Sequence, residues 1–244
     1  MADPDFILPD WPVAATVRAA VSLRTGGTSG GPFASLNLGG HVGDDPSAVA
    51  GNRARLAAAL HLPAEPLWLE QVHGSDVARF DGTPLPRADA SVALEPGQVC
   101  AVLVADCLPV LLADRAGRCV AAAHAGWRGL AAGVIENTVA SLPVAPSRLV
   151  AWLGPAIGPD AFEVGAEVRE QFLAADAGAE ELFRPGRAGR WMADLFGLAR
   201  RRLAAAGVTS VHGGGLCTLS DPGRFFSYRR DGLTGRHAAL VWRQ

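Results

Sequence analysis

Three side chains able to bind a metal ion follow apolar segments in the middle of the chain: His73, Cys107 and His124. Imidazole nitrogens and a cysteine thiolate are good zinc ligands, and three protein ligands leave a fourth tetrahedral position open, as in catalytic zinc sites. The three residues do not form a C-x-x-C or H-E-x-x-H motif, so the zinc hypothesis rests on their residue types alone. Two alternatives stay open: a buried cysteine with two hydrogen-bonded histidines, or a nucleophilic Cys107 with one histidine as its base.

Asp106 and several arginines accompany these three residues. Asp106 ends an apolar run beside Cys107, where its carboxylate could carry a proton, orient a metal ligand or form a turn. Arg128 lies in a glycine-flanked turn at the expected start of a helix, a place that favours anions, although a surface arginine fits as well. Arg24 and Arg229 lie beside glycine-containing loops. All 22 Lys and Arg side chains are arginines, so any phosphate site must use guanidinium or backbone N–H groups, and lysine chemistry is excluded.

The elements that must position these residues can be read from the hydrophobic pattern. Apolar runs of strand length stand at 14–23, 99–105, 109–113, 119–123, 149–153, 208–211 and 238–242. Helical patterns stand at 46–60, 130–142, 163–175 and 193–206. The candidate ligands therefore fall at strand ends, where α/β folds usually present site residues. Several strands follow one another without a helix between them, which predicts an α/β layer protein with mixed sheets.

Length and composition set the broad class. No linker or repeat divides the 244 residues, so we expect one domain over 1–244. The net charge is -2 and both signs are interspersed, so the sequence has no basic cluster of the kind that binds nucleic acid or anionic lipid. The most apolar stretch, 99–113, is too short to span a bilayer, and the four cysteines lack the spacing of a secreted disulfide scaffold. We expect a cytoplasmic protein without nucleic-acid or membrane partners.

Three stretches carry a family resemblance: QVHG at 71–74, ADCLPV at 105–110 and HAGWRG at 124–129. They resemble the signature stretches of the laccase-domain family, the YfiH-like group that is named after polyphenol oxidases and is also called the peptidoglycan-editing factor family. Further matching stretches, in the same order, cover most of the chain: RTGG at 24–27, SLNLG at 35–39, HVGDD at 41–45, GPAIG at 154–158 and FSYRRD at 226–231.

The resemblance implies a fold, a site and an activity. The fold is a layered αββα sandwich with mixed sheets. The site is zinc held by His73, Cys107 and His124, and we assign catalytic roles to Asp106 and Cys107. The activity is phosphorolysis of adenosine, inosine and 5′-methylthioadenosine, together with deamination of adenosine, so the partners are a purine nucleoside and phosphate. We assign substrate or phosphate binding to Arg24, Asn37, Gln71, Arg128 and Arg229.

Two other functions stay open beside this one. A zinc or Cys/His hydrolase could edit peptidoglycan precursors as a muropeptide amidase, and a non-catalytic zinc-stabilised binding protein could use His41 or Cys217 as a fourth ligand. True multicopper oxidation is excluded, because the six histidines include no H-x-H pair for a trinuclear cluster. Copper remains compatible with the zinc site as an incidental occupant.

Overall fold

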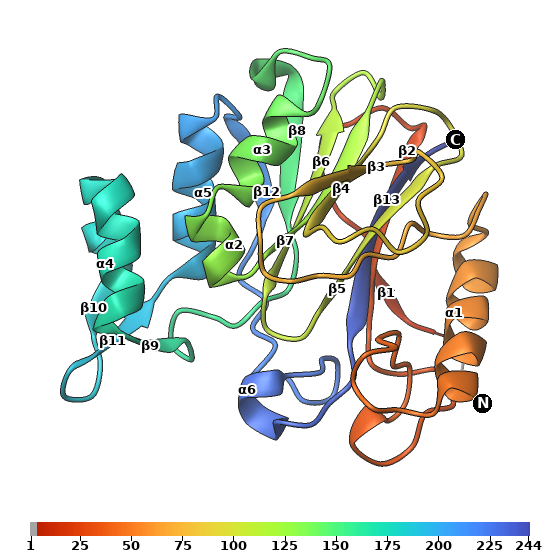
Figure 1. Ribbon diagram of the computed structural model, residues 1–244, viewed down its shortest axis with the longest axis horizontal. Helices are drawn as coiled ribbons and strands as arrows, with labels where there is room; N and C mark the ends of the chain where they lie inside the picture. Colours follow the sequence, from red (N-terminus) through yellow and green to blue (C-terminus); the bar gives the residue numbers. More distant parts are fainter. Residues whose placement is uncertain (1–3) are drawn as a thin grey trace.

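Two β-sheets packed face to face form the centre of the computed structural model, which describes residues 4–244 (Figure 1). The larger sheet has the strand order β12 (Ser210–Gly213), β8 (Leu149–Leu153), β6 (Leu108–Asp114), β7 (Val120–Ala125), β4 (Ala90–Ala93) and β3 (Val77–Arg79). The smaller has the order β1 (Phe6–Ile7), β2 (Val17–Ser22), β13 (His237–Arg243) and β5 (Val99–Val104). The pairs β12–β8 and β3–β4 are parallel and the others in the larger sheet antiparallel, so the predicted mixed α/β class is confirmed.

Helices cover the outer faces of both sheets (Figure 1). On the smaller sheet, Leu56 of α1 (Pro46–Leu60) joins a buried cluster with Leu240 of β13. The larger sheet carries α2 (Trp127–Ala131), α3 (Val134–Ala140) and α5 (Leu195–Ala205). Between the sheets, Val102 of β5 and Leu111 of β6 share one apolar core. The layers are therefore helix, sheet, sheet and helix, the order that the resemblance implied.

The first helix follows its sequence signals closely. The Asp45 side chain caps it by accepting a hydrogen bond of 2.9 Å from the backbone N–H of Ser47. Pro46 occupies the first turn, where no N–H donor is needed. The helix ends at Leu60, and His61 follows with a left-handed φ of +48°. The predicted range 46–60 is confirmed.

Two predicted helices differ from the structure. The helix expected at 130–142 already begins at Trp127 and is interrupted at Gly133, whose φ of +93° is accessible to glycine. The segment 163–175 begins as strand β9 (Glu163–Gly165), and α4 spans only Ala166–Ala175. β9 pairs with β11 (Arg190–Ala193), and β11 with β10 (Phe183–Pro185), in a small separate sheet. Local periodicity did not reveal β9, because its hydrogen-bonding partner lies more than twenty residues away.

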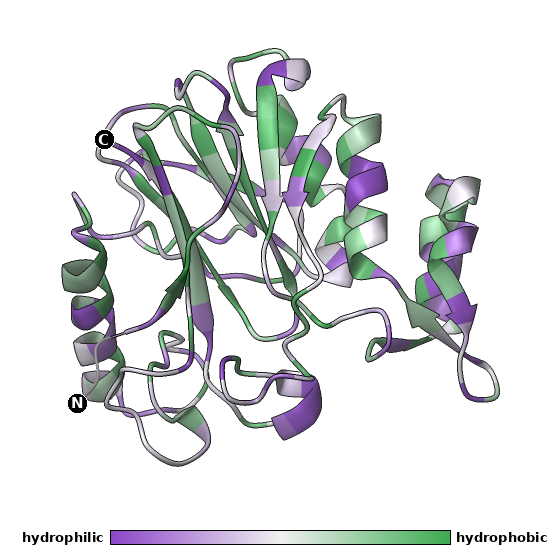
Figure 2. Cartoon of the chain, turned by 180° about the vertical axis from the view of Figure 1, so that it is seen from behind, coloured by the Kyte–Doolittle hydropathy of each residue, from purple (hydrophilic) through white to green (hydrophobic). Residues whose placement is uncertain are grey.

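The remaining elements are short. Short 3₁₀ helices occupy Gly31–Phe33, Pro146–Arg148 and Ala177–Leu182, and α6 spans Tyr228–Asp231. Figure 2 shows hydrophobic residues concentrated on the strands, whereas α6 is hydrophilic. Within residues 4–244, no helix combines the length and the apolar character needed to cross a membrane. Residues 1–3 of the predicted domain lie outside the described part of the chain.

The chain passes from one sheet to the other between β5 and β6, and this crossover positions the site. β5 belongs to the smaller sheet and β6 to the larger, so residues 105–107 connect the two. Asp106 makes this sharp connection with a φ of +85°. His124 lies inside β7, where it pairs with Pro109 of β6, and not beyond the strand end as predicted. Cys107 and His124 are thereby brought together from different segments.

Candidate metal centre and substrate cavity

His73, Cys107 and His124 form one group in the folded chain. Their ligand atoms all lie within 4.8 Å of one another, so the group could hold a metal ion. Cys107 Sγ is 3.8 Å from His73 Nε2. The two imidazole rings meet edge to face, with their centroids 4.8 Å apart and 72° between their planes. His124 is buried, Cys107 is half-buried and His73 is exposed, so the group lies at the boundary between the core and solvent.

Two glycines of the HAGWRG stretch allow the segments to approach this closely. A Cβ on Gly126 would lie 2.8 Å from Cys107 Sγ and 3.1 Å from His73 Cδ2. A Cβ on Gly129 would lie 2.7 Å from the backbone oxygen of Gly74. Any larger residue would push the cysteine or the His73 loop away. The glycines of this stretch are therefore explained by packing against the ligands.

A buried carboxylate supports both histidines. Asp89 accepts a hydrogen bond of 2.7 Å from His124 Nδ1 and is itself fully buried. It also accepts hydrogen bonds from the backbone N–H groups of Val72, His73 and Gly74, at 3.1, 2.9 and 2.7 Å. Orienting a ligand histidine was one of the roles that the sequence left open for Asp106, beside carrying a proton. In the structure, Asp89 makes that contact.

Cys107 and His124 each stabilise the charged form of the other. Burial by itself would raise the pKa of the Cys107 thiol, but the charge of His124 and hydrogen bonds from both histidines lower it. Burial would likewise lower the pKa of His124, whereas the Cys107 thiolate and Asp89 raise it. The net effect lowers the pKa of Cys107 and so favours its thiolate form. A thiolate is the form of cysteine that binds metals and acts as a nucleophile.

These residues fit a zinc ion. Zinc bonds of about 2.3 Å to sulfur and about 2.0–2.1 Å to nitrogen, at a tetrahedral angle, place the two donor atoms about 3.6 Å apart. The 3.8 Å between Cys107 Sγ and His73 Nε2 is close to that value. Hydrogen bonding of His124 Nδ1 to Asp89 leaves Nε2 as the free donor. Within residues 4–244 the group contains no fourth His, Cys, Asp or Glu, which leaves one coordination position without a protein ligand.

A cavity of about 410 Å³ opens beside the group. Sites for small molecules usually have volumes of about 300–1,000 Å³. The polar and aromatic lining residues are His41, Gln71, His73, Asp106, Cys107, His124, Trp127, Arg128, Phe162, Tyr228, Arg229 and Arg236. The cavity is thus large enough for a nucleoside, and it combines the three ligand atoms with guanidinium groups and aromatic rings.

Arg128 and Arg229, both predicted from the sequence, line this cavity. The Arg128 guanidinium lies 4.4 Å from the centre of the Trp127 ring. Arg229 lies 5.5 Å from the Phe162 ring and donates a hydrogen bond of 2.9 Å to the backbone oxygen of Glu163. Both side chains keep further N–H groups that can bind an anion, since each guanidinium has five.

Asp106 lines the cavity but directs its carboxylate oxygens at the segment that carries Arg229. Its oxygens accept hydrogen bonds from Thr218 Oγ1 at 2.6 Å, Ser227 Oγ at 3.0 Å and the backbone N–H of Arg229 at 2.6 Å. These contacts fix the start of α6 against the crossover between the sheets. They suit a residue that positions Arg229.

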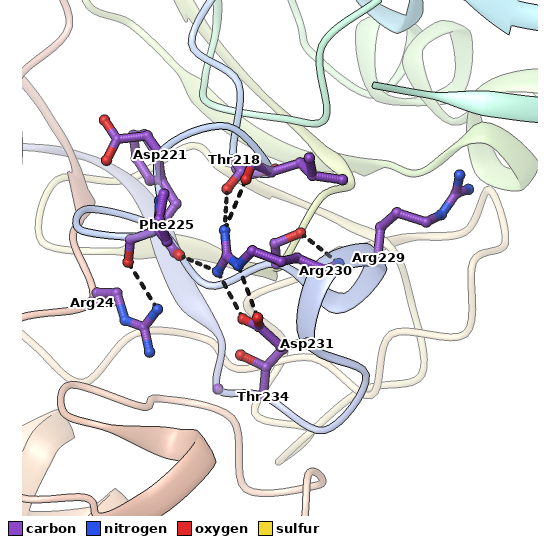
Figure 3. Close-up of polar contacts among 12 residues, drawn as sticks. Arg24, Thr218, Asp221, Phe225, Arg229, Arg230, Asp231 and Thr234 are labelled. Atoms are coloured by element: carbon purple, nitrogen blue, oxygen red, sulfur yellow. Dashed lines mark hydrogen bonds and ion pairs between the residues drawn. The ribbon is translucent and has the colours of Figure 1, made fainter. Parts of the chain in front are cut away.

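Arg230 holds the same segment from the other side (Figure 3). Its guanidinium donates hydrogen bonds to the backbone oxygens of Thr218, Leu219 and Phe225, and it pairs with Asp231 at 2.7 Å. Figure 3 shows the Arg229 side chain pointing away from this cluster. Arg230 therefore stabilises the loop, whereas Arg229 lines the cavity.

Three other predicted binding residues have structural partners. Arg24 donates hydrogen bonds to the backbone oxygens of Ala34 and Pro222, and it lies outside the cavity lining. Asn37 is fully buried, also outside the lining, and bonds to Gly39 and Asp44. Gln71 does line the cavity, but its side-chain amide is already hydrogen-bonded. Its NH₂ group donates to the Leu103 backbone oxygen and its oxygen accepts from the Leu103 N–H, as a neighbouring strand would do.

Sequence reasoning missed several residues of the site. Asp89 lies just before β4 and looks in sequence like a turn aspartate. Arg236 lines the cavity while donating to the backbone oxygens of Thr234 and Gly235. His41 also lines the cavity, and burial followed by the charge of Arg236 lowers its pKa. The sequence named His41 and Cys217 only as possible fourth metal ligands, and neither belongs to the His73–Cys107–His124 group in the described structure.

Comparisons with known proteins identify the family of this chain. Residues 18–244 match a protein family described as multi-copper polyphenol oxidoreductase laccase. A curated purine nucleoside phosphorylase from Pseudomonas aeruginosa is 58% identical over 240 residues, covering 98% of this chain and 98% of that protein. Purine nucleoside phosphorylase YfiH from Escherichia coli is 55% identical over 239 residues, covering 97% of this chain and 98% of that protein.

Solved structures resemble the fold over nearly its whole length. A protein from Neisseria meningitidis superposes with a TM-score of 0.94 at 48% identity, covering 98% of this chain and 99% of that one. YlmD from Geobacillus stearothermophilus superposes with a TM-score of 0.87 at 35% identity, covering 94% and 93%.

Proposed function

Because this chain belongs to the family described as multi-copper polyphenol oxidoreductase laccase, and relatives at 55–58% identity are named purine nucleoside phosphorylases, we propose that it is a purine nucleoside phosphorylase. The structural observation that carries the proposal is that one cavity joins the His73–Cys107–His124 group to Arg128 and Arg229. Its substrates are phosphate and the nucleosides adenosine, inosine and 5′-methylthioadenosine. The resident ion is zinc, held by the three ligands, with copper as an incidental occupant.

The arginines have a defined task in phosphorolysis. A phosphate oxygen bonds to C1′ of the ribose while the bond from C1′ to the purine breaks, and its electron pair leaves with the base. Arg128 and Arg229 hold the phosphate through charge-assisted hydrogen bonds. The departing purine accepts a hydrogen bond at nitrogen, and His41 and Tyr228 carry donor groups on the cavity wall. A zinc ion, when bound, supplies Lewis-acid polarisation of substrate atoms.

We extend the proposal to the deamination of adenosine, in which water replaces the C6 amino group and ammonia leaves. A group on the protein must take up the proton that the water loses. The sequence predicted Asp106 for this task, whereas its hydrogen bonds with Thr218, Ser227 and Arg229 support a positioning role. Asp106 as proton carrier remains a prediction.

A product analysis tests the proposal. Purified protein is assayed for its metal content and incubated with adenosine, inosine or 5′-methylthioadenosine, with and without phosphate, before chromatography. Phosphorolysis releases the free base only when phosphate is present, while deamination turns adenosine into inosine in either case. Absence of free base with all three nucleosides, from protein that carries stoichiometric zinc, would refute the phosphorylase assignment.

One observation favours a second candidate, a thiol hydrolase acting on peptidoglycan precursors. Asp89, His124 and Cys107 are arranged as an orienting acid, a base and a nucleophile, with the Cys107 pKa lowered by its histidine neighbours against the effect of burial. The two functions differ in their response to inhibitors. A thiol hydrolase keeps its activity after chelation and loses it on alkylation, whereas the zinc enzyme loses its activity on chelation.

A further inference from the structure

Asp89 is a buried acid whose two oxygens are fully used by the segments that carry the histidines. Oδ1 accepts from His73 N at 2.9 Å and His124 Nδ1 at 2.7 Å. Oδ2 accepts from Val72 N at 3.1 Å and Gly74 N at 2.7 Å. In addition, the Asp89 backbone oxygen accepts from His124 N at 2.7 Å. One residue therefore contacts both histidine-bearing segments, which lie about fifty residues apart in the sequence.

The contact with His124 decides which of its nitrogens is available. A neutral imidazole has one N–H and one lone pair, so an Nδ1–H that donates to Asp89 leaves the lone pair on Nε2. The His124 ring is fully enclosed, with only 4% of its side chain exposed. It cannot turn to exchange its nitrogens without losing its hydrogen bond to Asp89.

The contact with the His73 loop holds an unusual backbone. His73 has a φ of +61°, a left-handed conformation that is uncommon outside glycine. Three successive backbone N–H groups around it point to the Asp89 carboxylate. Such a concave arrangement of N–H groups binds anions, and here the anion is supplied by the protein. The exposed His73 side chain is thus held in place mainly through its backbone.

We propose that Asp89 is the positioning residue of the metal centre, which fixes the His124 tautomer and the His73 loop so that both Nε2 atoms face Cys107. The inference rests on the proposed zinc ligation by His73, Cys107 and His124. It concerns how the chain prepares the site, so it holds for the protein before any substrate binds.

Replacing Asp89 by asparagine tests this arrangement with almost no change in volume. An amide has one oxygen and one NH₂ group, so it can serve only one of the two donor pairs. Its NH₂ group would face either the Val72 and Gly74 N–H groups or the His73 and His124 N–H groups. One ligand segment must therefore lose its support.

The experiment measures zinc affinity by chelator competition, and the absorption spectrum of the Co²⁺-loaded protein, for the wild type, Asp89→Asn and Asp114→Asn. Asp114 is the matched control, because it is also fully buried and accepts several hydrogen bonds, but from Arg118 and Arg148 at the far end of β6. We expect Asp89→Asn to weaken zinc binding by about 10–100-fold and to alter the thiolate–Co²⁺ bands. Asp114→Asn should change neither. Wild-type zinc affinity and spectrum in folded Asp89→Asn would overturn the proposal.

A second measurement needs no variant, in case Asp89→Asn does not fold. Nitrogen-15 histidine NMR of the zinc-loaded wild type should show His124 protonated at Nδ1 and ligated through Nε2. Ligation through Nδ1 would overturn the proposal. If the proposed zinc ligation itself were wrong, the result would be different. The wild type would then bind no zinc, or would bind zinc equally well after replacement of Cys107.

Discussion

Arg24 and Arg128 both lie beside glycine-rich turns, yet their guanidinium groups have different partners. Arg24 donates to the backbone oxygens of Ala34 and Pro222 and stacks on Phe226 at 4.8 Å. Arg128 lines the cavity, and its guanidinium lies over the Trp127 ring. A side chain can bind phosphate only with donors that the fold has not already used.

We therefore expect the two arginines to respond differently to replacement by alanine. Arg128→Ala should raise the KM for phosphate about 10–100-fold, the effect of losing a hydrogen bond to a charged group. Arg24→Ala should leave this KM unchanged and lower the free energy of unfolding by about 1–3 kcal/mol, since the hydrogen bonds from a charged guanidinium to the Ala34 and Pro222 carbonyls are lost. Steady-state kinetics with varied phosphate, together with urea unfolding, measure both effects. A rise in the KM for phosphate that is equally large in both variants would contradict this assignment.

Removing a proposed ligand should remove the metal. We expect Cys107→Ala and His124→Ala to lose most bound zinc and most phosphorolysis while remaining folded, because a three-ligand site cannot spare a donor. Metal analysis of the purified variants, with circular dichroism to check the fold, provides the measurement. Cys119→Ala is the control, since Cys119 is a free, buried thiol far from the group in the sheet. Stoichiometric zinc and normal turnover in Cys107→Ala would refute the site.

At the scale of elements, the cavity is assembled from pieces that the crossover and α6 bring together. The turn at 105–107 carries Cys107 and Asp106 between the sheets, and α6 brings Tyr228 and Arg229 against it. Two side chains of opposite charge hold α6 in place. Asp106 accepts hydrogen bonds from the Ser227 hydroxyl and the Arg229 backbone N–H, and Arg230 donates to the backbone of the preceding loop. The placement of Arg229 therefore depends on residues that do not themselves need to touch the substrate.

The Asp106→Asn variant separates the roles considered for Asp106. If the residue positions Arg229, the KM for phosphate should rise and zinc should remain bound, because the amide loses one acceptor for the α6 donors. A proton carrier would instead lower turnover in deamination by about 10²–10⁴-fold at unchanged KM. A carboxylate that supported a ligand histidine would lower zinc affinity by about 10–100-fold. Kinetics and metal analysis of the same sample distinguish the three, and we expect the first.

At the scale of the whole molecule, the ligands come from three different regions of the fold. Cys107 lies at the crossover between the sheets, His124 in the larger sheet and His73 in a loop tied to β4 through Asp89. An ion bound to all three is bound only by the folded chain. Binding of this kind raises the free energy of unfolding by mass action.

Chelation should consequently lower the melting temperature as well as the activity. At a free zinc concentration 100 times the Kd, the ion contributes about 2.7 kcal/mol, which is lost on its removal. Thermal unfolding with and without chelator measures the shift, and added zinc should reverse it. Cys107→Ala should show no such shift, and an equal shift in this variant would mean that the stabilising ion binds elsewhere.

A buried histidine makes stability depend on pH. His237 of β13 is fully buried between Phe225 and Phe226, and neither ring nitrogen has a hydrogen-bond partner. Burial, together with the charges of Arg236 and Arg24, lowers its pKa to about 3. The folded state thus keeps His237 neutral, while the unfolded chain takes up a proton below its ordinary pKa of about 6.5. Stability must therefore fall as the pH drops from about 6.5 toward 3.

The expected size of this effect can be checked with one variant. Between pH 7 and pH 5 the wild type should lose about 2 kcal/mol more than His237→Leu, which cannot titrate. Urea unfolding at several pH values gives both slopes, and carboxylates contribute equally to each. Identical slopes in the two proteins would show that His237 is protonated, or solvated, in the folded state.

The sequence by itself determined the elements whose signals are local. Asp45 and Pro46 marked the start of α1, and the apolar runs marked β5, β6, β7 and β8. It also determined the three candidate ligands, because histidine and cysteine after apolar strands are few and chemically distinctive. The resemblance of the stretches around them implied the layered fold that the structure has.

Only the tertiary structure decided which polar groups are free to act. From the sequence alone, the charged residues Asp89, Asp106 and Arg24 are equally good candidates for a binding or catalytic site. Their roles follow from which donors and acceptors surround them, and those partners lie tens to hundreds of residues away. The strand β9 was missed for the same reason, since a strand is defined by its neighbour in the sheet. Hydrogen bonds between distant segments are made only when packing brings the segments together, so local sequence patterns do not contain them.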